Sequence, residues 1–166
     1  MTRGSRKLLR LYILIAAVTP GWSQTVTPGR ATFGRLCVAR VANSSGKPIA
    51  VDDMQQQLVE QLVRRKIDAV AAPTMTMLAS RLALTPSNRE AFPALKCDYL
   101  LLTEIASSPV SEQNSLAVRF SIFDKARQPM LETSVPAAGE NSGQATMAAI
   151  STVAGRVASA LDRKKR

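Results

Sequence analysis

Histidine is absent from the 166 residues, and cysteine occurs only twice, as Cys37 and Cys97. A chain without histidine has no Ser-His-Asp or Cys-His catalytic arrangement and no imidazole ligand for zinc. Two cysteines far apart in the sequence match no metal-binding spacing. The glycine-rich patterns that hold phosphate groups are also missing. We therefore expect no metal, no cofactor and none of the common catalytic centres in this protein.

Aromatic residues make up only 4% of the chain, and its one tryptophan, Trp22, lies near the amino terminus. The aromatic residues that follow are Phe33, Phe92, Tyr99, Phe120 and Phe123. Many proteins bind sugar rings by stacking them on tryptophan, and the body of this chain lacks that platform. This composition weighs against a carbohydrate-hydrolysing enzyme.

Positive charge is abundant, but it is concentrated at the two ends of the chain. Of the formal net charge of +10, four charges come from residues 3–10 and a net three from residues 162–166. Residues 11–161 therefore carry only +3. This balance is ordinary for a globular protein and is not the basic stripe of a nucleic-acid-binding protein, so we expect no nucleic-acid partner.

The amino-terminal segment has the features of a secretory signal peptide over residues 1–23. A basic start is followed by an apolar stretch at residues 11–18, and Gly21 and Ser23 are small residues where signal peptidase requires them. We expect cleavage between Ser23 and Gln24, and export to the periplasm or beyond by the general secretory route. A retained membrane anchor is the alternative, but this apolar stretch is much shorter than the ~20 residues that span a bilayer.

The rest of the chain is predicted to form one α/β domain, residues 35–162, between a flexible leader (24–34) and a basic tail (163–166). Hydrophobic patterns follow the order β-α-β-α-β-β-β-α. Two crossover connections make the first three strands parallel, and the closing meander is antiparallel. The simplest result is a mixed five-stranded sheet in the order 2-1-3-4-5, covered by helices. The expected strands are 35–42, 67–73, 98–104, 115–124 and 130–135, and the expected helices are 51–66, 74–95 and 143–162.

Local patterns add detail to these elements. The first helix has one apolar stripe, made of Val51, Met54, Leu58, Val59, Leu62 and Val63. Asp52 or Asp53 is expected to cap its start, and the basic residues 64–66 lie over its negative end. In the second helical region, Ser87 and Glu90 have capping-box spacing. The fourth strand alternates and is expected to have one buried face, made of Leu116, Val118, Phe120 and Ile122.

Asp98 and Glu104 are the best candidates for a pair of catalytic carboxylates. Six residues apart on a strand, their side chains share a face but lie about 20 Å apart, whereas paired catalytic carboxyls are roughly 5–9.5 Å apart. The two residues therefore do not form a catalytic pair. We expect Asp98 to cap the turn that enters its strand, and Glu104 to mark the solvent end of that strand.

Four segments of the chain form a recognisable pattern when they are taken together. They are RLCVARVANSSG (35–46), LVEQLVRRKIDAVA (58–71), FPALKCDYLLLTEI (92–105) and SLAVRFSIFD (115–124). The segments resemble a small periplasmic α/β module found in the amino-terminal domain of TolB, in the curli-secretion protein CsgG and in lipoprotein activators of penicillin-binding proteins. The glycine common in the last hairpin turn of such proteins is missing from DKARQP, residues 124–129. The resemblance implies an envelope protein that binds other proteins, and it brings no catalytic residues.

Three interpretations of the function remain open. We favour a noncatalytic protein-interaction module of the cell envelope, which is not an enzyme and has envelope proteins as its partners. The alternative is a small secreted hydrolase or ligand-binding protein whose Asp, Glu, Ser or Lys residues form a site that the sequence does not reveal. A third interpretation gives the terminal DRKKR segment a weak contact with anionic lipid or cell-wall polymer, although basic helix ends are more often solvated tails.

Cys37 and Cys97 are predicted to form a disulfide. They lie near the starts of strands one and three, which are neighbours in the proposed order, and an exported protein meets an oxidising compartment. Two buried free thiols are the alternative.

The loops after strands one and three are the predicted partner-binding surface. Both follow the carboxyl ends of parallel strands, where open α/β sheets form ligand crevices at a topological switch. Both loops are polar and rich in small residues. The predicted binding residues are Asn43, Ser44, Ser45, Lys47, Ser107, Ser108, Glu112 and Asn114.

Overall fold

The computed structural model describes residues 34–72, 85–108, 115–138 and 141–164. The predicted signal peptide and most of the leader lie outside the described residues. Three α-helices and six strands are described, together with one short 3₁₀ helix. In chain order they are β1 (Leu36–Ala39), β2 (Ala42–Asn43), α1 (Asp52–Arg64), β3 (Ala69–Ala72), α2 (Pro86–Ala91), η1 (Phe92–Leu95), β4 (Tyr99–Ser107), β5 (Leu116–Asp124), β6 (Pro129–Ala137) and α3 (Ser142–Arg163).

The sheet has the predicted strand order. Its strands lie in the order β3-β1-β4-β5-β6, which is 2-1-3-4-5 when the short β2 is counted as the end of the first predicted strand. β1 is parallel to both β3 and β4, and β5 and β6 are antiparallel additions. The first predicted strand is interrupted at residues 40–41, after which β2 pairs with β4 alone.

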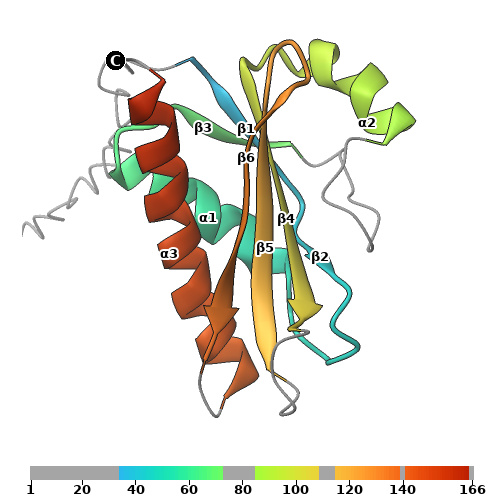
Figure 1. The fold of residues 1–166 in the computed structure, drawn as a ribbon, viewed down its shortest axis with the longest axis vertical. Coiled ribbons are helices and arrows are strands. Elements are labelled where there is room, and N and C mark those ends of the chain that lie inside the picture. Colours follow the sequence, from blue (N-terminus) through green and yellow to red (C-terminus); the bar gives the residue numbers. More distant parts are fainter. Residues whose placement is uncertain (1–33, 73–84, 109–114, 139–140, 165–166) are drawn as a thin grey trace, which may run out of the picture.

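Helices cover both faces of this sheet (Figure 1). α1 and α3 pack on one face over a core that includes Leu58, Phe120 and Val157. The opposite face carries a smaller cluster around Phe92, to which Cys37 and Leu100 belong. The β1-to-β3 crossover and the β3-to-β4 crossover therefore lie on opposite faces, as two right-handed connections from a shared switch require.

The helix α1 differs from its prediction at its start and on its stripe. Neither Asp52 nor Asp53 caps it, because Val51 occupies the N-cap position and both aspartates lie in the first helical turn. There they still complement the positive end of the helix dipole. Met54, Leu58 and Leu62 are buried as predicted, whereas Val63 is 45% exposed because it lies at the border of the stripe.

The second helical region is described from residue 85 onward, and residues 73–84 lie outside the described part. The predicted capping box at Ser87 and Glu90 is wrong, because α2 begins earlier. Thr85 is its N-cap and accepts a hydrogen bond from the Asn88 backbone N–H at 3.1 Å, and Pro86 occupies the first turn. The helix is short, as predicted from Pro93, and continues as η1.

The fourth predicted strand, β5, is buried on both faces rather than one. Its apolar face packs toward α1 and α3 as predicted. On the other face, Ala117 and Ser121 are also buried. Strand alternation assigns the side chains to the correct faces but does not indicate that both faces are buried.

The turn between β5 and β6 explains how the chain does without the usual glycine. Arg127 takes a positive φ of 64°, a conformation that glycine adopts most readily. Its N–H donates to the Asp124 carbonyl at 2.7 Å, and the Gln128 N–H donates to the Asp124 carboxylate at 3.0 Å. The bond from Gln128 is the largest cause of a lowered pKa for Asp124, and Lys164 lowers it further.

Candidate functional site

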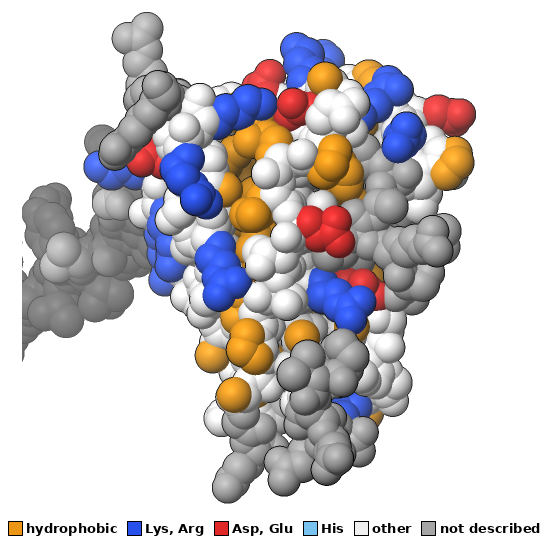
Figure 2. Space-filling view, viewed as in Figure 1, with side chains coloured by type: hydrophobic (Ala, Val, Ile, Leu, Met, Phe, Trp, Pro, Cys, Tyr) orange, Lys and Arg blue, Asp and Glu red, His pale blue; other side chains and the backbone are white. Residues whose placement is uncertain are grey.

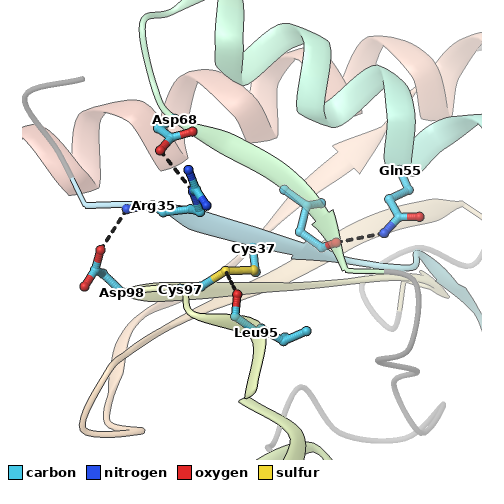
Figure 3. Close-up of a disulfide and its surroundings, with 8 residues drawn as sticks. Arg35, Cys37, Gln55, Asp68, Leu95, Cys97 and Asp98 are labelled. Carbon is cyan, nitrogen blue, oxygen red and sulfur yellow. Dashed lines mark hydrogen bonds and ion pairs between the residues drawn. A yellow bond between two sulfur atoms is a disulfide. The ribbon is translucent and has the colours of Figure 1, made fainter. Parts of the chain in front are cut away.

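The predicted disulfide is present and joins the centre of the sheet to the entry of β4 (Figure 3). Cys37 lies in β1, and Cys97 lies two residues before β4. Their Cα atoms are 5.8 Å apart, within the range that a disulfide spans. Both side chains are buried in the smaller core cluster. The bond therefore links strands that are also paired through their backbones.

Asp98 holds the start of β1, as Figure 3 shows. Its Oδ2 accepts a hydrogen bond from the Arg35 backbone N–H at 2.9 Å. The Arg35 side chain reaches the other way and donates to Asp68 at 3.1 Å. Gly34 lies so close to Asp98 that a Cβ atom would stand 2.5 Å from its Oδ2. Asp98 therefore has a capping role as expected, but the group that it caps is the entry of β1.

Glu104 does not mark the solvent end of its strand, contrary to expectation. It lies inside β4 and is only 1% exposed. Ser44 donates its hydroxyl to Glu104 Oε1, and Oε2 has no hydrogen-bond partner among the described residues. In the β-ladder, Arg119 of β5 stands directly opposite Glu104. The sequence offered one signal for this arrangement, namely a serine-rich turn predicted to lie beside the same strand.

The turn after β2 is fixed by its own polar side chains. Asn43 accepts hydrogen bonds from the Ser45 backbone N–H at 3.1 Å and the Ser45 hydroxyl at 2.7 Å, and it donates to the Lys47 carbonyl at 2.9 Å. Gly46 takes a positive φ of 72° at the bend. The turn is therefore held by side-chain hydrogen bonds of its own and is not merely a solvated connection.

The same turn is joined to the end of β4. The Ser44 N–H donates to the Ile105 carbonyl at 2.8 Å, and the Ser107 hydroxyl donates to the Ser45 carbonyl at 3.2 Å. The 43–47 turn and the end of β4 are thus neighbours at the carboxyl edge of the sheet. Of the predicted binding residues, Asn43, Ser44, Ser45, Lys47, Ser107 and Ser108 gather at this edge, while Glu112 and Asn114 lie outside the described residues.

The first two residues of the predicted basic tail belong to the folded domain. Arg163 ends α3, and Lys164 is its C-cap. The Lys164 ammonium group lies 3.4 Å from Asp124 Oδ2 and 5.5 Å from the centre of the Tyr99 ring. Within the described part of the chain, no helix has the length and apolar character needed to cross a membrane.

The fold and this edge define a small α/β module with a polar rim at its topological switch. Two solved structures of PelC from Paraburkholderia phytofirmans, both dodecamers, share the fold at TM-scores of 0.51 and 0.52. The sequence identity is 15%, and the match covers 73% and 72% of this chain and 86% and 83% of the PelC chains. No protein-family model matches the chain, and no curated protein matches it in sequence.

Two further structures match with lower TM-scores. TolB from Acinetobacter baumannii has a TM-score of 0.46 at 14% identity, covering 79% of this chain and 28% of TolB. The lipoprotein GNA1162 from Neisseria meningitidis has a TM-score of 0.47 at 16% identity, covering 75% of this chain and 96% of the lipoprotein. The two PelC structures, with TM-scores above 0.5, confirm the predicted α/β fold.

Proposed function

We propose that this chain is an exported cell-envelope protein that acts without catalysis, by binding other proteins through the carboxyl edge of its sheet. The observation that carries the proposal is the joined surface of the 43–47 turn and Ser107. Its backbone is held by hydrogen bonds within the turn and to β4. A preorganised surface loses little conformational entropy when a partner binds.

The disulfide supports export. Disulfides persist in oxidising compartments and are rare in the cytosol of mesophiles. The Cys37–Cys97 bond is buried, where it acts as part of the core. Together with the predicted signal peptide, it favours a protein that matures in the periplasm or outside the cell.

The positions of the acidic side chains support a noncatalytic role. Asp98 holds the Arg35 backbone, and Glu104 accepts from Ser44. Asp98 Oδ2 and Glu104 Oε1 thus have structural partners, and the two carboxylates lie in different parts of β4 or its entry. PelC, whose fold this chain shares, is a dodecamer, so we propose that a second copy of the chain is among its partners.

Two experiments test this proposal. Amino-terminal sequencing of the protein from fractionated producing cells is expected to find Gln24 as the first residue in the envelope fraction. Cytosolic protein that retains Met1 contradicts export. The binding test is chemical crosslinking in the native envelope. It compares the wild type with Ser107→Arg, which places a charge on the proposed edge, and with Gln56→Arg, which adds the same charge at an exposed position of α1.

The expected result is loss of the crosslinked species in Ser107→Arg alone, with all three proteins melting at similar temperatures. Crosslinked species that persist unchanged in Ser107→Arg place the binding surface elsewhere and contradict the proposed edge.

A further inference from the structure

A second surface lies on the opposite side of the molecule from the smaller core cluster, beside α3. It is an open groove of about 680 Å³ lined by residues of α1, β6 and α3. Three arginines line it, Arg65, Arg156 and Arg163, and no acidic side chain among the described residues does. Figure 2 shows blue Lys and Arg side chains along α3, beside a strip of hydrophobic side chains between α3 and the sheet. The groove therefore combines positive charge with small polar side chains and one apolar side chain, that of Leu131.

Two of these arginines are held in place by the fold. Arg156 donates to the Ser134 carbonyl at 2.9 Å. Arg65 donates to the Gln61 carbonyl at 2.8 Å and reaches the Ser151 carbonyl of α3 at 3.5 Å. A guanidinium group has five N–H donors, so each retains donors for a ligand. Arginines fixed in this way bind carboxylates with less loss of rotamer entropy than free side chains do.

Gly155 opens the centre of the groove. It lies in the interior of α3, where glycine is less favourable than alanine by about 1 kcal/mol. A Cβ atom built on Gly155 has no atom within 4 Å. No close packing therefore requires a glycine here. Its effect is to leave the helix backbone open to whatever occupies the groove, between the small side chains of Ser151 and Ser159.

We propose that this groove docks an acidic, extended segment of a partner protein. The three guanidinium groups match carboxylates in charge and in forked hydrogen-bond geometry. Leu131 provides an apolar contact, and the open backbone at Gly155 admits a polypeptide at close range. No aromatic residue lines the groove in the described structure, so it offers no stacking platform for an acidic polysaccharide.

The strand beside the groove, β6, limits how the acidic segment is held. Among the described strands, β6 is an outer strand of the sheet and pairs only with β5. Arg156 already occupies the Ser134 carbonyl of β6, and Pro129 and Pro136 lack backbone N–H groups. These features disfavour addition of a new strand to this edge. The docked segment is therefore bound through its carboxylates.

The test uses ¹⁵N-labelled mature protein with its disulfide intact and three probes. The first is a synthetic peptide of Glu-Ser-Pro repeats, the second its counterpart with Gln in place of Glu, and the third is heparin. The Gly155 amide resonance reports on the groove directly. The variants are Arg163→Glu, which reverses a charge in the groove, and Gly155→Leu, which fills it. The matched control is Arg64→Glu, because Arg64 and Arg163 both lie in the last turn of a helix and Arg64 does not line the groove.

The expected result is a saturable shift of the Gly155 resonance with the Glu peptide and none with the Gln peptide. Arg163→Glu is expected to weaken binding about tenfold or more, as loss of a charge-assisted hydrogen bond does, while Arg64→Glu stays within about twofold. Gly155→Leu removes the reporting glycine, so its binding is followed at the amide resonance of Ser151, which also lines the groove. This variant is expected to abolish binding without lowering the melting temperature. The proposal is overturned if neither peptide binds, if Arg64→Glu weakens binding as much as Arg163→Glu, or if heparin alone shifts the resonance.

Discussion

Reduction of the Cys37–Cys97 disulfide is predicted to remove a large part of the stability of the domain. The bond closes a loop with a sequence separation of 60. In the chain-entropy treatment, a crosslink over a loop of this length stabilises the folded state by about 4 kcal/mol. The backbone pairing of β1 with β4 keeps the two strands in register without the bond, so the reduced protein is expected to fold, but less stably. For a domain of this size the melting temperature should fall by roughly 10–20 °C.

The assay is urea unfolding followed by far-ultraviolet circular dichroism, with and without reductant, because the predicted mature chain has no tryptophan for fluorescence. A double variant, Cys37→Ala with Cys97→Ala, is the control and should not respond to reductant. The reasoning is refuted if reduction changes the free energy of unfolding by less than about 1 kcal/mol. It is equally refuted if the untreated protein, once unfolded, contains two titratable thiols.

Three further predictions concern local structure. Arg127→Gly is expected to raise the free energy of unfolding by about 1 kcal/mol, because glycine removes the strain of a positive φ; a lower midpoint in urea contradicts this. Gly34→Ala is expected to lower it by about 1 kcal/mol, because the added Cβ displaces the Asp98 carboxylate from its backbone partner, and the loss should disappear in an Asp98→Ala background. Asp124→Asn is expected to be less stable than wild type at neutral pH. Because its hydrogen bond from Gln128 and the nearby Lys164 lower the pKa of Asp124 in the folded state, its stabilising effect is present above the ordinary pKa of an aspartate and is lost as the pH falls through the lowered value. Urea unfolding at a series of pH values should show the two proteins converging in acid, and a constant gap contradicts the assignment.

The strand order could be predicted because it depends on general rules that need no side-chain detail. Alternation of strand and helix patterns gave the element types, and right-handed crossovers left β1 between β3 and β4. Adjacency of those strands then placed Cys37 near Cys97, and it brought the 43–47 turn beside Ser107. Each of these results follows from topology.

The burial of Glu104 could not be predicted in the same way. Strand periodicity assigns Glu104 to a face of β4, but it does not say whether that face is covered. Glu104 is only 1% exposed, and Ser44 supplies a partner from a loop distant in the sequence. A short sequence window contains neither fact. The positive φ of Arg127 was hidden for a related reason, since arginine gives no signal for a conformation that glycine normally marks.

Details of helix starts also depended on tertiary context. Thr85 and Ser87 are both suitable caps, and the choice between them was decided by Pro86, which favours the first helical turn.

The groove beside α3 had only a partial signal in the sequence. The basic residues 64–66 were interpreted as helix-end charges, and only the packing of α1 against α3 brought Arg65 beside Arg163.

Site-specific photocrosslinking in living cells tests the central claim most directly, namely that the protein binds partners through the carboxyl edge of its sheet. A photoreactive amino acid is placed at Ser107, which is exposed at that edge, or at Lys125, whose side chain is 82% exposed in the turn at the opposite end of the sheet. The account predicts discrete adducts with envelope proteins, including further copies of the chain, from position 107 and none of these from position 125. The account is contradicted if adducts form from position 125 but not from position 107. It is also contradicted if every adduct from position 107 contains a cytosolic protein.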